Sequence, residues 1–160
     1  ENKNQIQLLK AMERLKDKYP NIKALFVGEG LKLQELQQQA TERGIQKHVQ
    51  FLGFRTDITE LINVSNIGVL LSYREGLPRN LMELMACGRQ MIGTNIRGCR
   101  DVICDDTVGC LVEVGDDETL AHEIERLYLK NDSSFSLSPH LKKYEMASVL
   151  KELKMIYEGV

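Results

Sequence analysis

Short apolar runs alternate with stretches of helical periodicity along most of this chain, and few folds accommodate that alternation. The apolar runs lie at 23–27, 49–52, 67–71, 90–94 and 109–112. Their length and composition are those of buried strands. Strands that alternate with helices form β-α-β units, which make a parallel sheet. Because these crossovers are right-handed, helices cover both faces. The sequence therefore predicts an α/β fold with a doubly wound, Rossmann-like parallel sheet.

Apolar residues at helical spacing mark six stretches: 4–18, 33–40, 58–62, 79–87, 117–127 and 146–156. The helix expected over 79–87 begins just after Pro78 and ends at Gly88, and both residue types are favoured at those helix ends. The serine-rich stretch 131–139 is expected to be a linker before the last helix. No internal repeat is visible, so residues 1–160 are expected to form a single domain.

Composition excludes several classes of protein. The chain has 160 residues, of which 42% are hydrophobic and 28% are charged, as in soluble globular proteins. Its net charge of −2 lacks the basic excess of a nucleic-acid binder. No apolar run approaches the roughly 18–20 residues of a membrane helix. The first residues do not resemble a signal peptide. Because residue 1 is not Met, we expect a piece of a longer protein.

The cysteine and histidine spacing predicts neither a zinc site nor a disulfide framework. Cys87, Cys99, Cys104 and Cys110 contain no C-x-x-C pair, and the three histidines are scattered. We expect free thiols at small buried positions, in a protein of the reducing cytosol.

Ligands of doubly wound sheets bind beyond the carboxyl ends of the strands. The loops at 28–30, 53–55, 72–80 and 95–100 follow the first four predicted strands and should converge on one rim. The third loop is the most informative because it leads directly into a helix. The backbone N–H groups at that helix start form an anion site.

Two glutamates flank this anion site. Glu75 precedes the turn and Glu83 lies within the helix, while Gly76 allows a ligand to approach the backbone. A carboxylate on each side of a bound phosphate suits a nucleotide sugar, which carries hydroxyls on both sides of its diphosphate. Spacing alone leaves the alternative that Glu83 is a solvated helix residue and that Glu75 pairs with Arg74 or Arg79.

The run 72–88, S-Y-R-E-G-L-P-R-N-L-M-E-L-M-A-C-G, resembles the signature of the group 1 (family 4) retaining glycosyltransferases of the GT-B fold. The core of that signature is a pair of glutamates separated by seven residues. Segments 26–30, 49–55 and 105–112 also resemble the family, and 95–103 resembles its bacterial polysaccharide-biosynthesis members. The resemblance runs across nearly the whole chain and implies the donor-binding, C-terminal half of a GT-B fold.

The resemblance implies a role for each matched residue of the loop after the third strand. Glu75 would be the catalytic residue that contacts the hydroxyls of the donor sugar. Glu83 would hold the hydroxyls of the ribose. The backbone amides of Gly76 and Leu77 would bind the diphosphate together with the helix start.

Five further residues are implied in donor binding. Lys3 would bind phosphate, although a solvated terminus is an alternative reading. Gly28 and Gly30 would leave room near the diphosphate. Phe54 and Arg55 lie where the family holds the nucleobase, although Arg55 is equally well read as a surface charge.

The resemblance implies transfer of a hexose or N-acetylhexosamine from a UDP- or GDP-sugar, with a UDP-sugar favoured, to a glycan or lipid-linked acceptor. It implies no cofactor and no metal, so Asp105-Asp106 is read as a turn. An absent N-terminal domain would bind the acceptor, which leaves the isolated chain inactive. The location implied is cytoplasmic, with peripheral contact to the inner face of the membrane in the full enzyme. Two alternatives stay open: a non-catalytic nucleotide-binding or regulatory α/β module, and a sugar-nucleotide epimerase of related fold.

Overall fold

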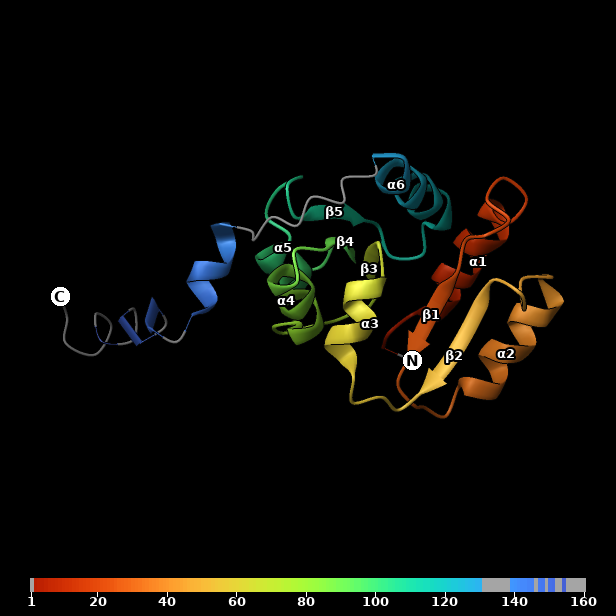
Figure 1. Cartoon of the computed structure of the whole chain (residues 1–160), viewed down its shortest axis with the longest axis horizontal. Coiled ribbons are helices and arrows are strands. Elements are labelled where there is room, and N and C mark those ends of the chain that lie inside the picture. Colours follow the sequence, from red (N-terminus) through yellow and green to blue (C-terminus); the bar gives the residue numbers. More distant parts are fainter. Residues whose placement is uncertain (1, 131–138, 146, 149, 152–153, 155–160) are drawn as a thin grey trace.

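The computed structural model describes residues 2–130, 139–145, 147–148, 150–151 and 154. Within them strands and helices alternate as the sequence predicts (Figure 1). The strands are β1 (Ala24–Val27), β2 (Val49–Gly53), β3 (Ile67–Leu70), β4 (Gln90–Thr94) and β5 (Gly109–Val112). The helices are α1 (Gln5–Leu15), α2 (Leu33–Glu42), α3 (Ile58–Val64), α4 (Arg79–Ala86), α5 (Arg97–Val102), α6 (Asp117–Lys130) and the 3₁₀ helix η1 (Pro139–Tyr144).

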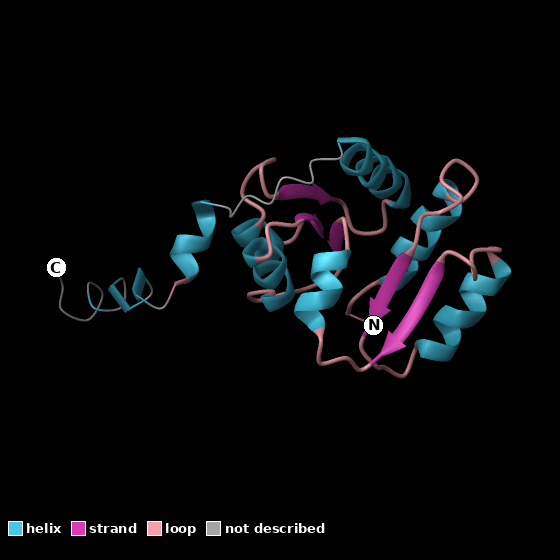
Figure 2. Cartoon of the chain, viewed as in Figure 1, coloured by secondary structure: helices cyan, strands magenta, loops and turns pink. Residues whose placement is uncertain are grey.

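All strand pairs are parallel, and helices lie on both sides of the strands (Figure 2). α1 and α6 pack on one face through a core that contains Leu15, Ile92 and Leu120. α4 and α5 pack on the other face, where Leu81 and Val102 meet Met91. The predicted α/β class and its Rossmann-like architecture are therefore confirmed.

The strands form two sheets, which the sequence did not predict. β1 pairs with β2, and β3, β4 and β5 form a second sheet in that order. A cavity of about 640 Å³ separates the two sheets and is lined by residues of both β1 and β3. We call this cavity the inter-sheet slot.

α1 holds the two sheets together, because its residues enter both cores. Leu9 and Met12 pack against the β1–β2 sheet, whereas Ala11 and Leu15 pack against the three-stranded sheet. Arg14 Nε also donates a hydrogen bond of 2.7 Å to Asp117 Oδ2 on α6.

Three expectations need correction or lie outside the described residues. The segment 95–100 was expected to be a loop, but α5 begins at Arg97. This helix is too short, at six residues, to show a period. Cys104 is exposed, contrary to the expectation that the thiols are buried, because it lies in the loop after α5. The linker at 131–138 and most of the last predicted helix fall outside the described residues.

None of the helices in the described part of the chain is long and apolar enough to cross a membrane.

Candidate functional site

The loop after β3 is fixed at its first residue. Ser72 is fully buried, and its carbonyl oxygen accepts a hydrogen bond of 2.6 Å from Oγ1 of buried Thr94. Thr94 ends β4, so this bond ties the carboxyl ends of two neighbouring strands together. Further along the loop, Gly76 and Leu77 are exposed. The backbone of these two residues is therefore accessible to a ligand, while the first residue of the loop is held in place.

Glu75 lies between buried Ser72 and the solvent. Its Oε1 accepts hydrogen bonds from Lys3 Nζ at 2.6 Å and from Ser72 Oγ at 2.5 Å. Partial burial raises the pKa of the Glu75 carboxyl, but the bonds from Lys3 and Ser72 outweigh burial and hold the pKa below its ordinary value. Glu75 is thus a carboxylate at neutral pH, and its ion-pair partner is Lys3 rather than Arg74 or Arg79.

The residues before α1 are tied to the same loop, which places Lys3 at the site. The Tyr73 amide donates to the carbonyl of Asn2 at 2.8 Å, and Asn2 Nδ2 donates to the Arg74 carbonyl at 2.8 Å. Tyr73 Oη also donates to Asn4 Oδ1 at 3.2 Å. These contacts hold Lys3 at the site, so it is not part of a solvated terminus, although half of its side chain is exposed.

α5 packs against the backbone of the loop after β3. A Cβ atom on Gly98 would lie 2.5 Å from the Gly76 carbonyl oxygen and 2.6 Å from that of Glu75. Only glycine allows this close approach of a helix to the loop backbone. The position of Glu75 therefore depends on a residue of the following β-α unit.

α4 begins at the end of this loop. Its N-cap residue is Pro78, and no side chain caps the helix start. The first backbone N–H groups of α4 are therefore open to an anion. Glu83 is exposed on this helix, and its carboxylate forms no hydrogen bond or ion pair with the described residues. Its carboxylate is thus accessible to a ligand.

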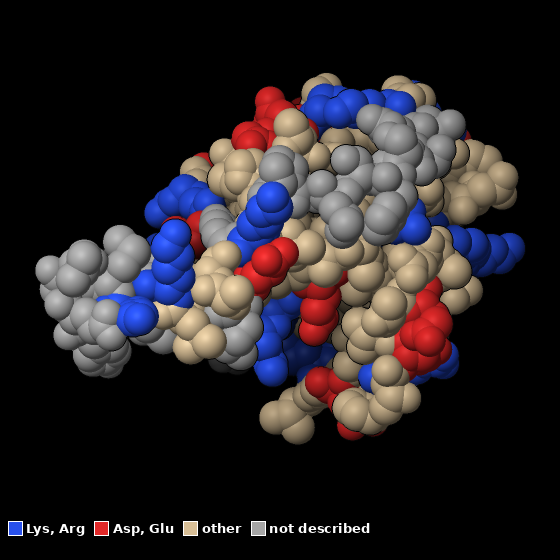
Figure 3. Space-filling model, turned by 60° about the vertical axis from the view of Figure 1, so that its left-hand side comes forward, with Lys and Arg blue, Asp and Glu red and all other residues tan. Residues whose placement is uncertain are grey.

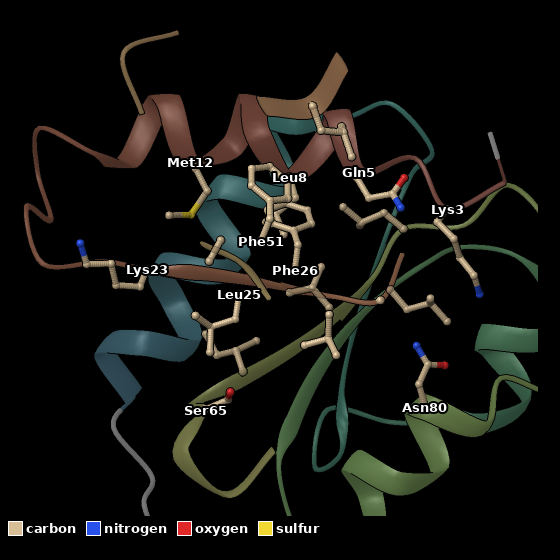
Figure 4. A pocket seen from close by; sticks show the side chains of 18 of the residues that line it. Lys3, Gln5, Leu8, Met12, Lys23, Leu25, Phe26, Phe51, Ser65 and Asn80 are labelled. Atoms are coloured by element: carbon tan, nitrogen blue, oxygen red, sulfur yellow. The ribbon is translucent and has the colours of Figure 1, made fainter. Parts of the chain in front are cut away.

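The inter-sheet slot opens toward this rim. Lys3 and Asn80 lie at one end and Lys23 lies at the other end (Figure 4). Gly28 and Gly30 also line the slot, and Gly28 has a φ of +114°, which favours glycine. The remaining predicted site residues lie outside its lining.

The two residues predicted to hold a nucleobase behave differently. Phe54 is 72% exposed, so its ring has space for a ligand. Arg55 forms an ion pair with Asp57, with Nε 2.7 Å from Oδ1. The Arg55 guanidinium holds the pKa of the Asp57 carboxyl below its ordinary value. Arg55 is therefore already paired with Asp57, which agrees with the alternative that it is a surface charge.

Gln7 is a polar residue of this region that the sequence did not identify as a site residue. Gln7 is buried, and its Nε2 donates to the carbonyls of Glu113 and Asp116 at 3.0 Å each. Its Oε1 accepts from the Gly115 amide at 2.9 Å. The start of α1 is thus fixed to the loop after β5. A glutamine within an apolar helix face was the available signal.

Outside the rim, the described residues bring three metal-ligand types together. Ligand atoms of Cys104, Asp105 and His140 lie within 4.8 Å of one another. Their sequence spacing did not indicate this proximity. Asp105 accepts hydrogen bonds from the amide and hydroxyl of Thr107 and forms a turn, as expected. His140 Nε2 lies 2.7 Å from Asp105 Oδ2.

Charge on the surface is mixed. Figure 3 shows Lys and Arg side chains interspersed with Asp and Glu on the face in view. This distribution agrees with the small net charge of −2 and offers no broad basic surface on that face.

The fold is that of known glycosyltransferases. The structure of HepE of Anabaena in complex with UDP-glucose matches 99% of this chain and 46% of HepE, at 22% identity and a TM-score of 0.84. The structure of TarM matches 95% of this chain and 32% of TarM, at 21% identity and a TM-score of 0.85. These likenesses support one Rossmann-like half of a GT-B fold.

Sequence comparison identifies the family. The chain is 38% identical to the glycosyltransferase EpsD of Bacillus subtilis (strain 168) over 162 residues, 99% of this chain and 42% of EpsD. It is 31% identical over 166 residues, 98% of this chain and 45% of the relative, to an alpha-1,4-N-acetyl-D-galactosaminyltransferase of Campylobacter jejuni. It thus spans less than half the length of either relative. The family Glycosyl transferases group 1 matches residues 1–144, so the chain belongs to the group 1 glycosyl transferases.

Proposed function

We propose that this chain is the donor-binding part of a retaining glycosyltransferase that moves a sugar from a nucleoside-diphosphate sugar, favourably a UDP-sugar, to a glycan or lipid-linked acceptor. One observation carries the proposal. A carboxylate kept ionised by Lys3 and Ser72 precedes a helix start that no side chain caps, and a second carboxylate is exposed on that helix. Hydroxyls, a diphosphate and further hydroxyls are the matching features of a sugar nucleotide.

In this arrangement the diphosphate binds at the start of α4. The amides of Gly76 and Leu77 and the positive end of the α4 dipole stabilise its charge. Lys3 Nζ lies 2.6 Å from Glu75 Oε1, and from this position its ammonium group can also reach a phosphate. The proposed site thus provides positive charge without a cofactor or a metal.

Glu83 binds the ribose hydroxyls and Glu75 binds the hydroxyls of the donor sugar. Phe54 lies beside the nucleobase, and backbone atoms near Arg55 complete that contact. Gly28 and Gly30 leave space for the diphosphate.

The chemical step is assisted by electrostatics. As the sugar leaves, negative charge grows on the diphosphate and positive charge grows on the sugar ring. The α4 start and Lys3 stabilise the former, and the ionised Glu75 stabilises the latter. Because these groups are fixed before the reaction, they need little reorganisation during it.

Comparison with relatives supports the two substrate classes. HepE, with the same fold, was solved with UDP-glucose. The Campylobacter jejuni relative is named for an undecaprenol-linked glycan acceptor. In our proposal the acceptor binds to the part of the enzyme outside these 160 residues, at the cytoplasmic side of a membrane.

Calorimetric titration of UDP tests the proposal. We expect UDP to bind at millimolar concentration or below. We expect Glu83→Ala to weaken UDP binding more than Glu75→Ala, because every nucleotide has the ribose whereas only the sugar donor reaches Glu75. The loss of a hydrogen bond to a charged group costs about 1.5–3 kcal/mol, or roughly tenfold to a hundredfold in affinity.

Glu118→Ala, an exposed glutamate on α6, is the matched control and should leave UDP affinity unchanged. No heat with any nucleoside diphosphate would contradict the donor site. Equal effects of the Glu83 and Glu75 variants on UDP would contradict the division of roles.

A further inference from the structure

Three residues of types that bind metal ions gather beside the amino end of β5. Cys104 and Asp105 lie in the loop between α5 and β5, and His140 lies in η1. One ligand atom from each residue, a sulfur, a carboxylate oxygen and a ring nitrogen, lies within 4.8 Å of the other two. The proposed donor loops follow the carboxyl ends of the parallel strands instead. The Cys-Asp-His cluster is therefore separate from the proposed donor site.

Asp105 is held in position by its neighbour Thr107. Its Oδ1 accepts hydrogen bonds from the Thr107 amide, at 2.9 Å, and from the Thr107 hydroxyl. Its Oδ2 lies 2.7 Å from His140 Nε2. The bonds from Thr107 and His140 lower the pKa of the Asp105 carboxyl to about 2, so the group is ionised at neutral pH. Hydrogen bonds from neighbouring groups orient metal-binding carboxylates in the same way.

The packing of η1 on the core places His140 beside this loop. Tyr144 Oη donates a hydrogen bond of 2.8 Å to the carbonyl of Asp101, in α5. Leu141 and Tyr144 also pack against the core that α4 and α5 form with β4. His140 therefore reaches Asp105 through the fold, because 35 positions separate the two residues in the sequence.

The separations of the ligand atoms suit a tetrahedral metal ion. Zinc binds sulfur at about 2.3 Å and nitrogen or oxygen at about 2.0–2.2 Å, so its tetrahedral ligand atoms lie about 3.3–3.6 Å apart. The distance of 2.7 Å between Asp105 and His140 is shorter than this, and the limit of 4.8 Å for the whole cluster is longer. Shifts of about 1 Å reconcile them. Cys104 is exposed, so its side chain can turn without disturbing the core.

The donor set also selects the kind of metal. Magnesium and calcium bind oxygen ligands, whereas thiolate and imidazole favour zinc among the divalent ions. A thiolate and a carboxylate together carry two negative charges, which balance the charge of Zn²⁺. Three protein ligands leave the fourth tetrahedral position to water.

We propose that Cys104, Asp105 and His140 bind one Zn²⁺ ion, with water as the fourth ligand, and that the ion fastens η1 to the loop between α5 and β5. Cys104 binds as the thiolate, and its proton passes to the solvent. The ion lies between the Asp105 oxygen and the His140 nitrogen, in place of their direct contact. Its role is to stabilise the folded chain, so the inference is independent of the proposed function.

Cobalt binding tests the ligand set, because Co²⁺ adopts the same geometry as Zn²⁺ and gives a spectrum. The untagged chain is titrated in the presence of a phosphine reductant, which keeps its thiols reduced. We expect one Co²⁺ per chain and a thiolate-to-cobalt charge-transfer band. The band should be absent in Cys104→Ser and present in the matched control Cys87→Ser, since Cys87 ends α4 outside the cluster. An unchanged band in Cys104→Ser overturns the proposal.

Competition with other ions tests the identity of the metal. Zn²⁺ should displace the bound Co²⁺, whereas an excess of Mg²⁺ should not. Displacement by Mg²⁺ would show an oxygen site and overturn the proposal. One ion per two chains, in a dimer that forms only with metal, would show a bridge between copies and also overturn it.

Affinity for Zn²⁺, measured against a chromophoric chelator, tests the other two ligands. Asp105→Asn and His140→Gln should each weaken binding by at least about tenfold, as the loss of a ligand is at least as costly as the loss of a group that supports one. Asp106→Asn and His122→Gln are the matched controls, because both residues are exposed and lie outside the cluster. A wild type that binds Zn²⁺ no more tightly than these ligand variants overturns the proposal.

Amide hydrogen exchange tests whether the ion fastens η1. Zn²⁺ should slow exchange of the Leu141 and Tyr144 amides in the wild type by at least about tenfold and leave them unchanged in Cys104→Ser. It should also raise the urea midpoint of the wild type alone, because a ligand of the folded state stabilises that state. A wild type that binds one Zn²⁺ without slower exchange in η1 overturns the fastening.

Discussion

At the residue scale, the site depends on a chain of side chains that starts in the core. Buried Thr94 holds the Ser72 carbonyl, the Ser72 hydroxyl holds Glu75, and Lys3 binds the same carboxylate oxygen. Each bond fixes the next group, so the carboxylate is oriented before a ligand arrives. Such preorganisation lowers the cost of binding.

Replacement of Lys3 should change the acidity of Glu75. In Lys3→Met the ammonium donor is lost while the burial of Glu75 and its bond to Ser72 remain, so the Glu75 pKa should rise. The titration of the side-chain carboxyl carbon by NMR measures this directly. Lys10→Met is the control, because Lys10 lies 3.8 Å from Asp117 and not at Glu75.

The same substitution has a defined pH dependence of stability. A pKa held below its ordinary value of 4.5 stabilises the folded state above about that pH, and the contribution is lost as pH falls through the folded pKa. The stability difference between the wild type and Lys3→Met should therefore be full near neutrality and disappear in acid. A Glu75 pKa that does not move in Lys3→Met would show that the ion pair is not formed in solution.

Part of this chain of contacts was predictable from the sequence. The motif with Glu75 and Glu83 identified the loop and helix, because both lie in one continuous segment. Ser72 and Gln7 were not identified as site residues. The bond from Gln7 to Glu113 spans 106 positions, and no local pattern indicates a contact of that separation.

At the element scale, the strands were the most predictable part, because each is a short apolar run between polar segments. α5 was missed for a physical reason. It is stabilised by burial of Cys99 and Val102 in the core beside α4 and β4 rather than by a periodic pattern of its own. The split of the sheet was also invisible, since pairing partners are not encoded in the composition of a strand.

Gly98→Ala tests the support that α5 gives to the loop. Helix propensity alone would stabilise the variant by roughly 0.5–1 kcal/mol. The added Cβ, however, would lie 2.5 Å and 2.6 Å from two backbone oxygens of the loop. Overpacking of this kind costs about 1–3 kcal/mol, so we expect net destabilisation in urea unfolding.

Gly30→Ala is the control for this variant, since no atom lies within 4 Å of a Cβ at that position. We expect little change in its urea midpoint. A Gly98→Ala protein as stable as the wild type would mean that the loop moves away at no cost and is not held by α5.

At the scale of the whole molecule, the carboxyl-end rim gathers the proposed donor residues, while the chain spans 42% and 45% of its two relatives. Leu77 and Phe54 are exposed there at 54% and 72%. The proposed acceptor site requires a surface that faces this rim. In our proposal that surface belongs to the remainder of the enzyme.

The 160 residues alone should therefore transfer no sugar. Alignment of the acceptor with the donor carbon contributes up to roughly 7–11 kcal/mol to catalysis, and the groups that provide it lie elsewhere in our proposal. An assay with a labelled sugar nucleotide and a broad mixture of acceptors should show at most slow donor hydrolysis. Sustained transfer would contradict the division between donor and acceptor parts.

The pairing of α1 with α6 has a consequence for synthesis of the chain. Residues 5–15 are made before their partners Leu120 and Ile124, which leave the ribosome more than a hundred positions later. At roughly 5–20 residues per second, the interval is on the order of 5–25 seconds. Through that interval the apolar side of the first helix lacks its final cover, so slow elongation lengthens the time for which a chaperone would have to protect it.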